Sequence, residues 1–254
     1  MNNNRKNLRR AARSTRLQKN LAAVCLFCSC SSPTLAATAE SIEPQASGVF
    51  LNADGDVLTA RHAVAGCHSL YVIKDGKVVM ATLRAVNDAD DIAVLATALK
   101  PLLSAVFQRS ALPPDRSVTV FFEAYSRLLS LPDRAFTLSN AITVPGDGGE
   151  LQLLSGAKPG TSGSAVLSSG GLVLGMAVER IASAPSVAGM AQAHVRNPAQ
   201  TDGGTLVKAV PASTIKHFLR AADIGFAESD VAQIGARQSP AARAFTLGAG
   251  VICG

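Results

Sequence analysis

The chain has 254 residues, of which 48% are hydrophobic and 17% are charged. This length and composition allow one large domain or two small ones with a buried core, and they exclude a wholly disordered chain. Seven Lys or Arg residues and no acidic residue lie in residues 1–39, so the rest of the chain holds 17 basic and 18 acidic residues. The formal net charge of +6 therefore belongs to the N-terminal segment, and a basic nucleic-acid-binding domain is not supported.

Residues 1–39 have the order of a secretory signal peptide. A basic front precedes an apolar run from Leu21 to Cys30, and a small-residue Ala-x-Ala pattern ends at Ala39. The apolar run has ten residues, well short of the roughly 20 that a stable membrane-spanning helix needs. We therefore expect cleavage near Ala39, export to the periplasm or the medium, and no stable membrane span. A disordered basic arm is the alternative. The residues before Cys30 suit lipidation poorly, so we expect no lipid anchor.

Beyond the leader the sequence contains two cysteines, Cys67 and Cys253. In an oxidising compartment these two could form a disulfide bond. The alternative is two unpaired thiols, because the sequence does not provide the separation of the Cα atoms. The leader cysteines Cys25, Cys28 and Cys30 are followed by no His or Cys pair at zinc-ligand spacing, so we expect no metal site.

From Gly48 onward, short apolar segments alternate with turn signals. An Asp-Gly turn within Lys74–Lys77, for example, separates two apolar segments and predicts a β-hairpin. Prolines and glycines interrupt the pattern at 113–115, the predicted linker between two halves, and at 145–149, a further turn. Many short strands at regular spacing indicate an all-β barrel or sandwich.

One helix is expected near the end of this pattern. It should follow Pro211, because Ile215, Phe218 and Leu219 fall at helical spacing. Residues 223–254 are rich in Ala, Gly and Ser, and the sequence assigns no role to this tail.

Three segments carry residues that are suited to catalysis. His62 follows a predicted strand, Asp91 opens an apolar strand, and Ser162 lies between glycines in a turn between two strands. A base, an orienting acid and a nucleophile are the three parts of a serine hydrolase site. Gly160 and Gly163 would let the backbone turn tightly, so the backbone N–H groups of Gly160 and Ser162 could face a developing oxyanion.

The quoted segments resemble those of the chymotrypsin-like serine proteases, in the chain order His, Asp, Ser. The likeness is closer to the bacterial branch that includes the HtrA-type and glutamyl-endopeptidase-like enzymes. It is carried by Ser47–Phe50, Leu58–His62, Asp91–Leu95 and Pro159–Ser164, and it extends over about residues 47–221. Each motif alone is weak, but the His, Asp and Ser motifs in this order, each with a matching flank, form a specific signal.

This resemblance implies an all-β, chymotrypsin-like fold of two antiparallel, six-stranded-type β-barrels with a C-terminal helix. The first barrel would occupy residues 40–112 and carry His62 and Asp91, and the second would occupy residues 113–222 and carry Ser162. Residues 223–254 would remain a tail of unknown role, and we expect no PDZ domain after the second barrel.

The resemblance also assigns roles position by position. His62 would be the general base, Asp91 the acid that orients it, and Ser162 the nucleophile, with Gly160 and Ser162 forming the oxyanion hole.

Substrate-binding residues are also implied. The strand Ala177, Val178 and Glu179 would pair with an extended peptide, as a sheet edge can. Gly156 would lie at the base of the specificity pocket. Since Gly156 is not Asp, we expect no trypsin-like preference for Lys or Arg.

These inferences predict a secreted or periplasmic serine endopeptidase that acts on a peptide or protein substrate and needs neither a metal nor an organic cofactor. One alternative is a pseudoprotease, a binding protein on the protease fold. The other is a serine esterase with Ser162, Asp202 and His217. The esterase motif would need Gly at position 164, where this sequence has Ser.

Overall fold

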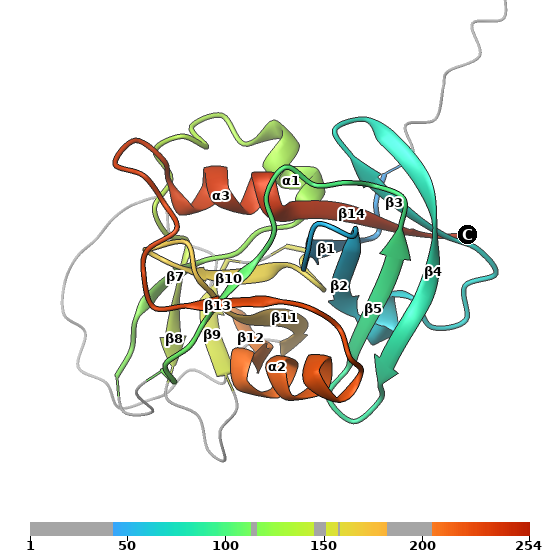
Figure 1. Ribbon diagram of the computed structural model, residues 1–254. Coiled ribbons are helices and arrows are strands. Elements are labelled where there is room, and N and C mark those ends of the chain that lie inside the picture. Colours follow the sequence, from blue (N-terminus) through green and yellow to red (C-terminus); the bar gives the residue numbers. More distant parts are fainter. Residues whose placement is uncertain (1–42, 113–115, 145–150, 157, 182–204) are drawn as a thin grey trace, which may run out of the picture. The chain divides into compact units, whose positions relative to one another are not determined.

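A computed structural model of the protein describes residues 43–112, 116–144, 151–156, 158–181 and 205–254. The predicted signal peptide, the predicted linker at 113–115, the predicted turn at 145–149 and Asp202 lie outside the described residues. Figure 1 shows the strands of one barrel on the right of the view and those of a second barrel on the left.

The first barrel is a closed ring of six antiparallel strands in the order β1-β14-β3-β4-β5-β2. Its interior is filled by apolar side chains that include Phe50, Val57, Val72 and Leu95. The strands are β1 (Ala46–Phe50), β2 (Asp56–Ala60), β3 (Leu70–Lys74), β4 (Lys77–Asn87), β5 (Ile92–Thr97) and β14 (Gly248–Cys253).

The strand β14 comes from the tail to which the sequence assigned no role. It pairs with β1, where Ser47 lies opposite Gly250, and with β3, where Val251 lies opposite Val72. Gly250 is needed there because a Cβ atom would lie 2.6 Å from side-chain atoms of Pro44 and Ile73. The first barrel thus extends beyond residues 40–112, since closing the ring requires a strand between β1 and β3.

The second barrel also closes through six strands, because β10 pairs with both β7 and β11. Its order is β10-β7-β8-β9-β12-β11. Two short strands extend the sheet: β6 pairs in parallel with β11, and β13 pairs in parallel with β6. The ring strands are β7 (Thr119–Phe121), β8 (Ala141–Val144), β9 (Leu151–Ser155), β10 (Ala165–Ser168), β11 (Val173–Ile181) and β12 (Thr205–Pro211). The added strands are β6 (Val106–Gln108) and β13 (Ala227–Ser229).

A core cluster joins the two barrels. It contains Val49 and Leu58 from the first barrel and Phe121 and Leu167 from the second, all at most 1% exposed. Val49 points to this shared cluster while its neighbour Phe50 points into the first barrel. Because both faces of β1 are covered, this strand is buried along its whole length.

Helices fill the ends of the fold. The predicted helix is α2 (Ala212–Ala221), which directly follows Pro211 and buries Ile215, Phe218 and Leu219 as expected. A short α1 (Tyr125–Ser130) and a 3₁₀ turn, η1 (Arg61–Ala63), are further elements.

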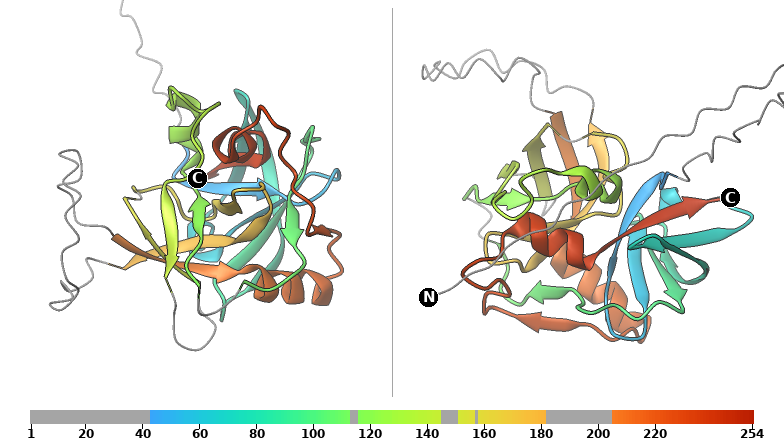
Figure 2. Two further views of the ribbon diagram at one scale, coloured as in Figure 1. Left: turned by 90° about the vertical axis from the view of Figure 1, so that its left-hand side faces the viewer. Right: turned by 90° about the horizontal axis from the view of Figure 1, so that it is seen from above.

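A helix in the tail, α3 (Pro240–Leu247), was not predicted. Ser239 caps it by accepting a hydrogen bond from the Ala242 nitrogen at 3.0 Å, and Pro240 occupies its first turn. Figure 2 shows that α3 leads directly into β14.

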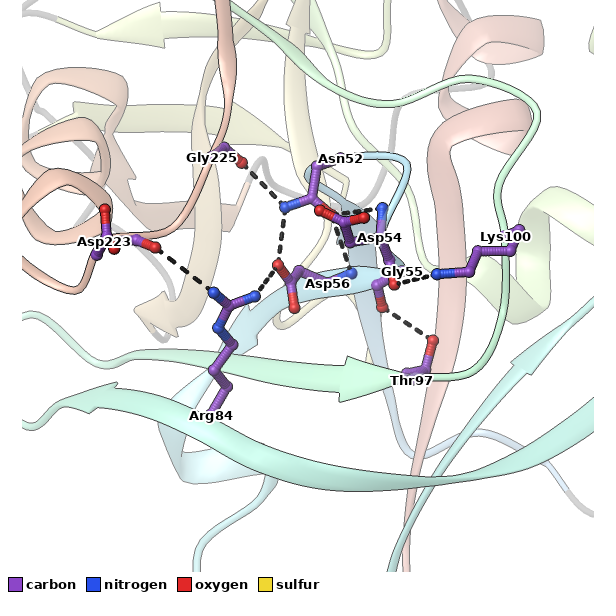
Figure 3. A network of polar contacts seen from close by, with 9 residues as sticks. All are labelled: Asn52, Asp54, Gly55, Asp56, Arg84, Thr97, Lys100, Asp223 and Gly225. Carbon is purple, nitrogen blue, oxygen red and sulfur yellow. Dashed lines mark hydrogen bonds and ion pairs between the residues drawn. The ribbon is translucent and has the colours of Figure 1, made fainter.

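A polar network ties the turn between β1 and β2 to the chain that follows α2 (Figure 3). Asn52 Nδ2 donates to a carboxylate oxygen of Asp56 at 2.7 Å and to the Gly225 carbonyl at 3.0 Å. Arg84 forms an ion pair with the buried Asp56 and also contacts the Asp223 carbonyl. The buried carboxylate is therefore paired, and its partners fasten the start of the tail to the first barrel.

Candidate active site

His62 and Asp91 are brought together by the pairing of β2 with β5. The two strands are antiparallel with Ala60 opposite Ile92, so Arg61, the first residue after β2, meets Asp91, and His62 follows it. Asp91 Oδ1 accepts a hydrogen bond from the His62 backbone nitrogen at 2.8 Å, and Asp91 Oδ2 lies 2.6 Å from His62 Nδ1. The Asp91 carbonyl in turn accepts from the Arg61 nitrogen at 3.0 Å.

The contacts of Asp91 hold the imidazole in one orientation. A carboxylate beside Nδ1 favours the tautomer with hydrogen on Nδ1, which leaves Nε2 free to accept a proton. Asp91 has a φ of 55°, a left-handed conformation that Asp adopts more readily than most residues. The neighbouring Asp90 points elsewhere, because its Oδ2 accepts from Asn87 Nδ2 at 2.7 Å.

Ser162, the predicted nucleophile, lies directly before β10 in residues 158–164, which we call the nucleophile loop. Gly160 and Gly163 give this loop its shape with φ values of 88° and 86°. A Cβ atom on Gly163 would lie 1.9 Å from the Ser47 carbonyl oxygen, so only glycine allows β1 to approach so closely. Ser162 Oγ donates to the Val178 carbonyl at 3.1 Å.

The three predicted catalytic residues line one open pocket of about 460 Å³. They come from both barrels, with His62 and Asp91 on one side and Ser162 on the other. The full lining is His62, Asp91, Pro159, Gly160, Thr161, Ser162 and Val178. The sequence assigned no role to Pro159 or Thr161, although both flank Ser162 in its motif.

The backbone nitrogens of the nucleophile loop differ in their hydrogen bonds. Within the described ranges, the nitrogens of Gly160 and Ser162 have no hydrogen-bond partner. In contrast, the Gly163 nitrogen donates to the Ala177 carbonyl at 2.8 Å, and the Ser164 nitrogen donates to the Thr161 carbonyl at 2.9 Å. The two nitrogens without a partner among the described residues are the pair that the sequence predicts for the oxyanion hole.

The predicted substrate-binding residues are placed differently from one another. Val178 lines the pocket, but Ala177 is buried, and its nitrogen and carbonyl already bond to Ser164 and Gly163. The backbone of Glu179 lies opposite that of Lys208 where β11 pairs with β12. Gly156 is exposed and does not line the pocket.

Cys67 and Cys253 form a disulfide bond, with their Cα atoms 5.2 Å apart. Cys67 follows the turn that carries His62, and Cys253 ends β14. The carbonyl of Gly254 also accepts hydrogen bonds from the nitrogens of His68 and Ser69, at 2.8 and 3.0 Å. Cys253 and Gly254 are thus bonded to residues 67–69, which follow the turn that carries His62.

Two further features of the described residues bear on the site. No helix in these ranges combines the length and apolar character that crossing a membrane requires. In the same part of the chain, no group of three or more His, Cys, Asp or Glu side chains is placed to hold a metal ion.

The esterase alternative does not match the arrangement around Ser162. A strand, β10, follows the nucleophile loop where an esterase elbow would need a helix. His217 lies on α2 and does not line the pocket.

Comparison with solved structures finds HtrA-type proteases. The HtrA-type protease AlgW with a decapeptide is 20% identical with a TM-score of 0.49, covering 70% of this chain and 51% of that chain. The serine endoprotease from Yersinia pestis is 16% identical with a TM-score of 0.48, covering 70% of this chain and 57% of that chain. This chain therefore matches only slightly more than half the length of these proteins.

Sequence comparison identifies the family. None of the curated proteins matches this chain in sequence. Residues 46–176, however, match the model of the trypsin-like peptidase domain. Because that match spans more than half of the chain and includes the segments of both barrels that meet at the pocket, the protein belongs to the trypsin-like peptidase family and has its chymotrypsin-like, two-barrel fold.

Proposed function

We propose that this protein is a serine endopeptidase that cleaves its substrate through an acyl-enzyme on Ser162. The observation that supports this most directly is the shared pocket in which Ser162 lies beside a His62–Asp91 pair with a 2.6 Å contact. The order of residues 1–39 supports the further proposal that the enzyme is secreted or periplasmic.

The first half of the reaction is acylation. His62 Nε2 takes the proton of Ser162 Oγ as this oxygen bonds to the carbonyl carbon of the substrate. The electron pair of the carbonyl moves to its oxygen, and the N–H groups of Gly160 and Ser162 stabilise that oxyanion. The carbonyl then re-forms, the bond to the leaving nitrogen breaks, and His62 gives its proton to the amine. In deacylation, water follows the same path and restores Ser162.

The resting position of Ser162 requires one movement before this reaction. Its hydroxyl donates to the Val178 carbonyl, so this bond must be exchanged for one to His62 before the proton is transferred. Catalytic hydrogen bonds are often loose without substrate and tighten in the complex. The same observation is what favours the second candidate, a catalytically inactive protease-fold binding protein in which Ser162 stays on Val178.

Labelling with a fluorophosphonate separates these two candidates, because the reagent forms a bond with an activated serine. We expect the purified protein to be labelled and Ser162→Ala to lose all labelling. Ser164→Ala is the matched control, since Ser164 lies two residues away and its buried hydroxyl has no partner in the described structure. It should keep its labelling.

Equal labelling of Ser162→Ala and the parent protein would refute the proposal. A folded parent that is not labelled at all would favour the inactive binding protein.

A further inference from the structure

Ser47 lies on β1 of the first barrel, yet its side chain contacts the second barrel. It is 2% exposed, so its hydroxyl needs hydrogen-bond partners within the protein. Ser47 Oγ donates to the Gly160 carbonyl at 2.8 Å and accepts from the Tyr125 nitrogen at 2.9 Å. The hydroxyl therefore joins a strand of the first barrel to the nucleophile loop and to the start of α1.

The backbone of Ser47 makes two more contacts with catalytic segments. Its nitrogen donates to the Ser162 carbonyl at 2.8 Å, and its carbonyl accepts from Thr59 Oγ1 at 2.7 Å. Thr59 lies on β2, three residues before His62. Ser47 thus bonds directly to the residue that carries the nucleophile and to the strand that leads to the base.

The two carbonyls that Ser47 holds bracket the peptide between Thr161 and Ser162. The N–H of that peptide is one of the two proposed oxyanion donors, and Gly160 carries the other. Holding the carbonyls of Gly160 and Ser162 restricts rotation of the intervening backbone, so the Ser162 N–H is aimed before a substrate arrives. Such preorganised donors cost no reorganisation when charge develops on the substrate oxygen.

From these contacts we infer that Ser47 is a positioning residue, which sets the Ser162 oxyanion donor of the nucleophile loop through its side-chain bond to the Gly160 carbonyl. This inference rests on the proposed function. It assigns Ser47 no contact with substrate, because it acts through the backbone of residues 160–162.

The test compares Ser47→Ala with Ser239→Ala. Both serines are buried, and each hydroxyl donates one hydrogen bond to a carbonyl and accepts one from a backbone nitrogen. Ser239 makes its bonds at the start of α3, away from the pocket, so its loss affects stability alone. For the full-length protein and both variants, two quantities are measured with a fluorophosphonate. They are the maximal rate of phosphonylation and the reagent concentration that gives half of that rate.

We expect Ser47→Ala to lower the maximal rate about 10- to 100-fold, because losing one oxyanion donor costs about 10²–10³ and here the Ser162 donor remains but is misaligned. The half-saturating concentration should change little, since the donors act mainly in the transition state. Ser239→Ala should keep the parent's maximal rate at a temperature where circular dichroism shows all three proteins folded.

An active parent with equal maximal rates in the two variants would overturn the inference alone, as would a change confined to the half-saturating concentration. A folded parent without any phosphonylation would overturn the proposed function and this inference with it. If Ser47→Ala does not fold, Ser47→Cys takes its place, because a thiol fills similar space but is a weak hydrogen-bond donor. A parent-like maximal rate in folded Ser47→Cys would likewise overturn the inference.

Discussion

Three aspartates follow β4 in one short turn, and each has a different partner. Asp88 pairs with Arg61, Asp90 accepts from Asn87, and Asp91 alone contacts His62. Asp91 binds both the backbone nitrogen and the ring of His62 with its two carboxylate oxygens. The geometry of this turn therefore gives each of the three aspartates a different partner.

The proposed role of Asp91 predicts a large effect for Asp91→Asn. The amide has only one acceptor oxygen, so it cannot accept from both nitrogens of His62 and favours the wrong tautomer of the ring. We expect the maximal rate of phosphonylation at neutral pH to fall by about 10⁴-fold, as for the corresponding change in a Ser-His-Asp triad. Asp90→Asn in the same turn is the control and should remain close to the parent. A parent-like rate in folded Asp91→Asn would rule out Asp91 as the orienting acid.

Among the strands, β14 gives the C-terminal tail a structural role that the sequence did not predict. It closes the first barrel between β1 and β3, and the disulfide at its end reaches the segment behind His62. Residues 248–253 are therefore a structural part of the barrel that carries the predicted base. Removing the tail would take away a strand of the first barrel, so a truncated protein should lose stability.

The disulfide predicts a measurable share of this stability. Cys67 and Cys253 are separated by 186 positions, so their bond restricts a long loop in the unfolded chain. The double variant Cys67→Ser, Cys253→Ser should lose about 2–5 kcal/mol of unfolding free energy, measured by urea denaturation. A reductant should lower the urea midpoint of the parent toward that of the double variant and leave the variant unchanged. A parent midpoint that does not respond to reductant would argue against the bond in the folded protein.

Across the whole molecule, the chain builds most of the first barrel, then the second, and returns to the first. On the return path, Glu228 of β13 binds Lys216 Nζ at 2.7 Å and Arg220 at 3.0 Å, both on α2. Lys216 Nζ also donates to the Gln108 carbonyl of β6 at 2.9 Å. These contacts hold the returning chain against the second barrel before it reaches α3 and β14.

This ion cluster predicts an acid-dependent loss of stability. The hydrogen bond from Lys216, supported by the positive charges of Lys216 and Arg220, lowers the pKa of Glu228 below its ordinary value of 4.5. The folded state therefore holds this proton less tightly than the unfolded state, and the pair's contribution is present above pH 4.5 and lost as pH falls through the lowered pKa. Glu228→Gln should thus be less stable than the parent to urea at pH 7. The difference should shrink as the pH falls below 4.5 and through the lowered pKa of Glu228. A difference that stays constant over this fall in pH would contradict this account.

The sequence could predict features that depend on residues close together in the chain, but not contacts between residues far apart in it. His62, Asp91 and Ser162 each stand in a short motif beside a strand, and α2 follows from apolar residues at helical spacing, so local patterns identified them. The cap of α3 is a local signal of the same kind, a serine followed by a proline at Ser239 and Pro240. The contacts of Ser47 had no such signal, because its partners Gly160 and Ser162 are more than 110 positions away.

The sequence by itself thus indicated the all-β class through its short strands and turns. Through the resemblance of its motifs, it also indicated the two-barrel family and the three residues proposed for catalysis. Only the tertiary structure decided that β14 completes the first barrel, that Cys253 meets Cys67, and that Ser47 holds the nucleophile loop. The physical reason lies in barrel closure, which pairs residues from opposite ends of the chain. The glycines that allow β14 to pack closely also weaken its strand pattern, as Gly250 does beside Pro44.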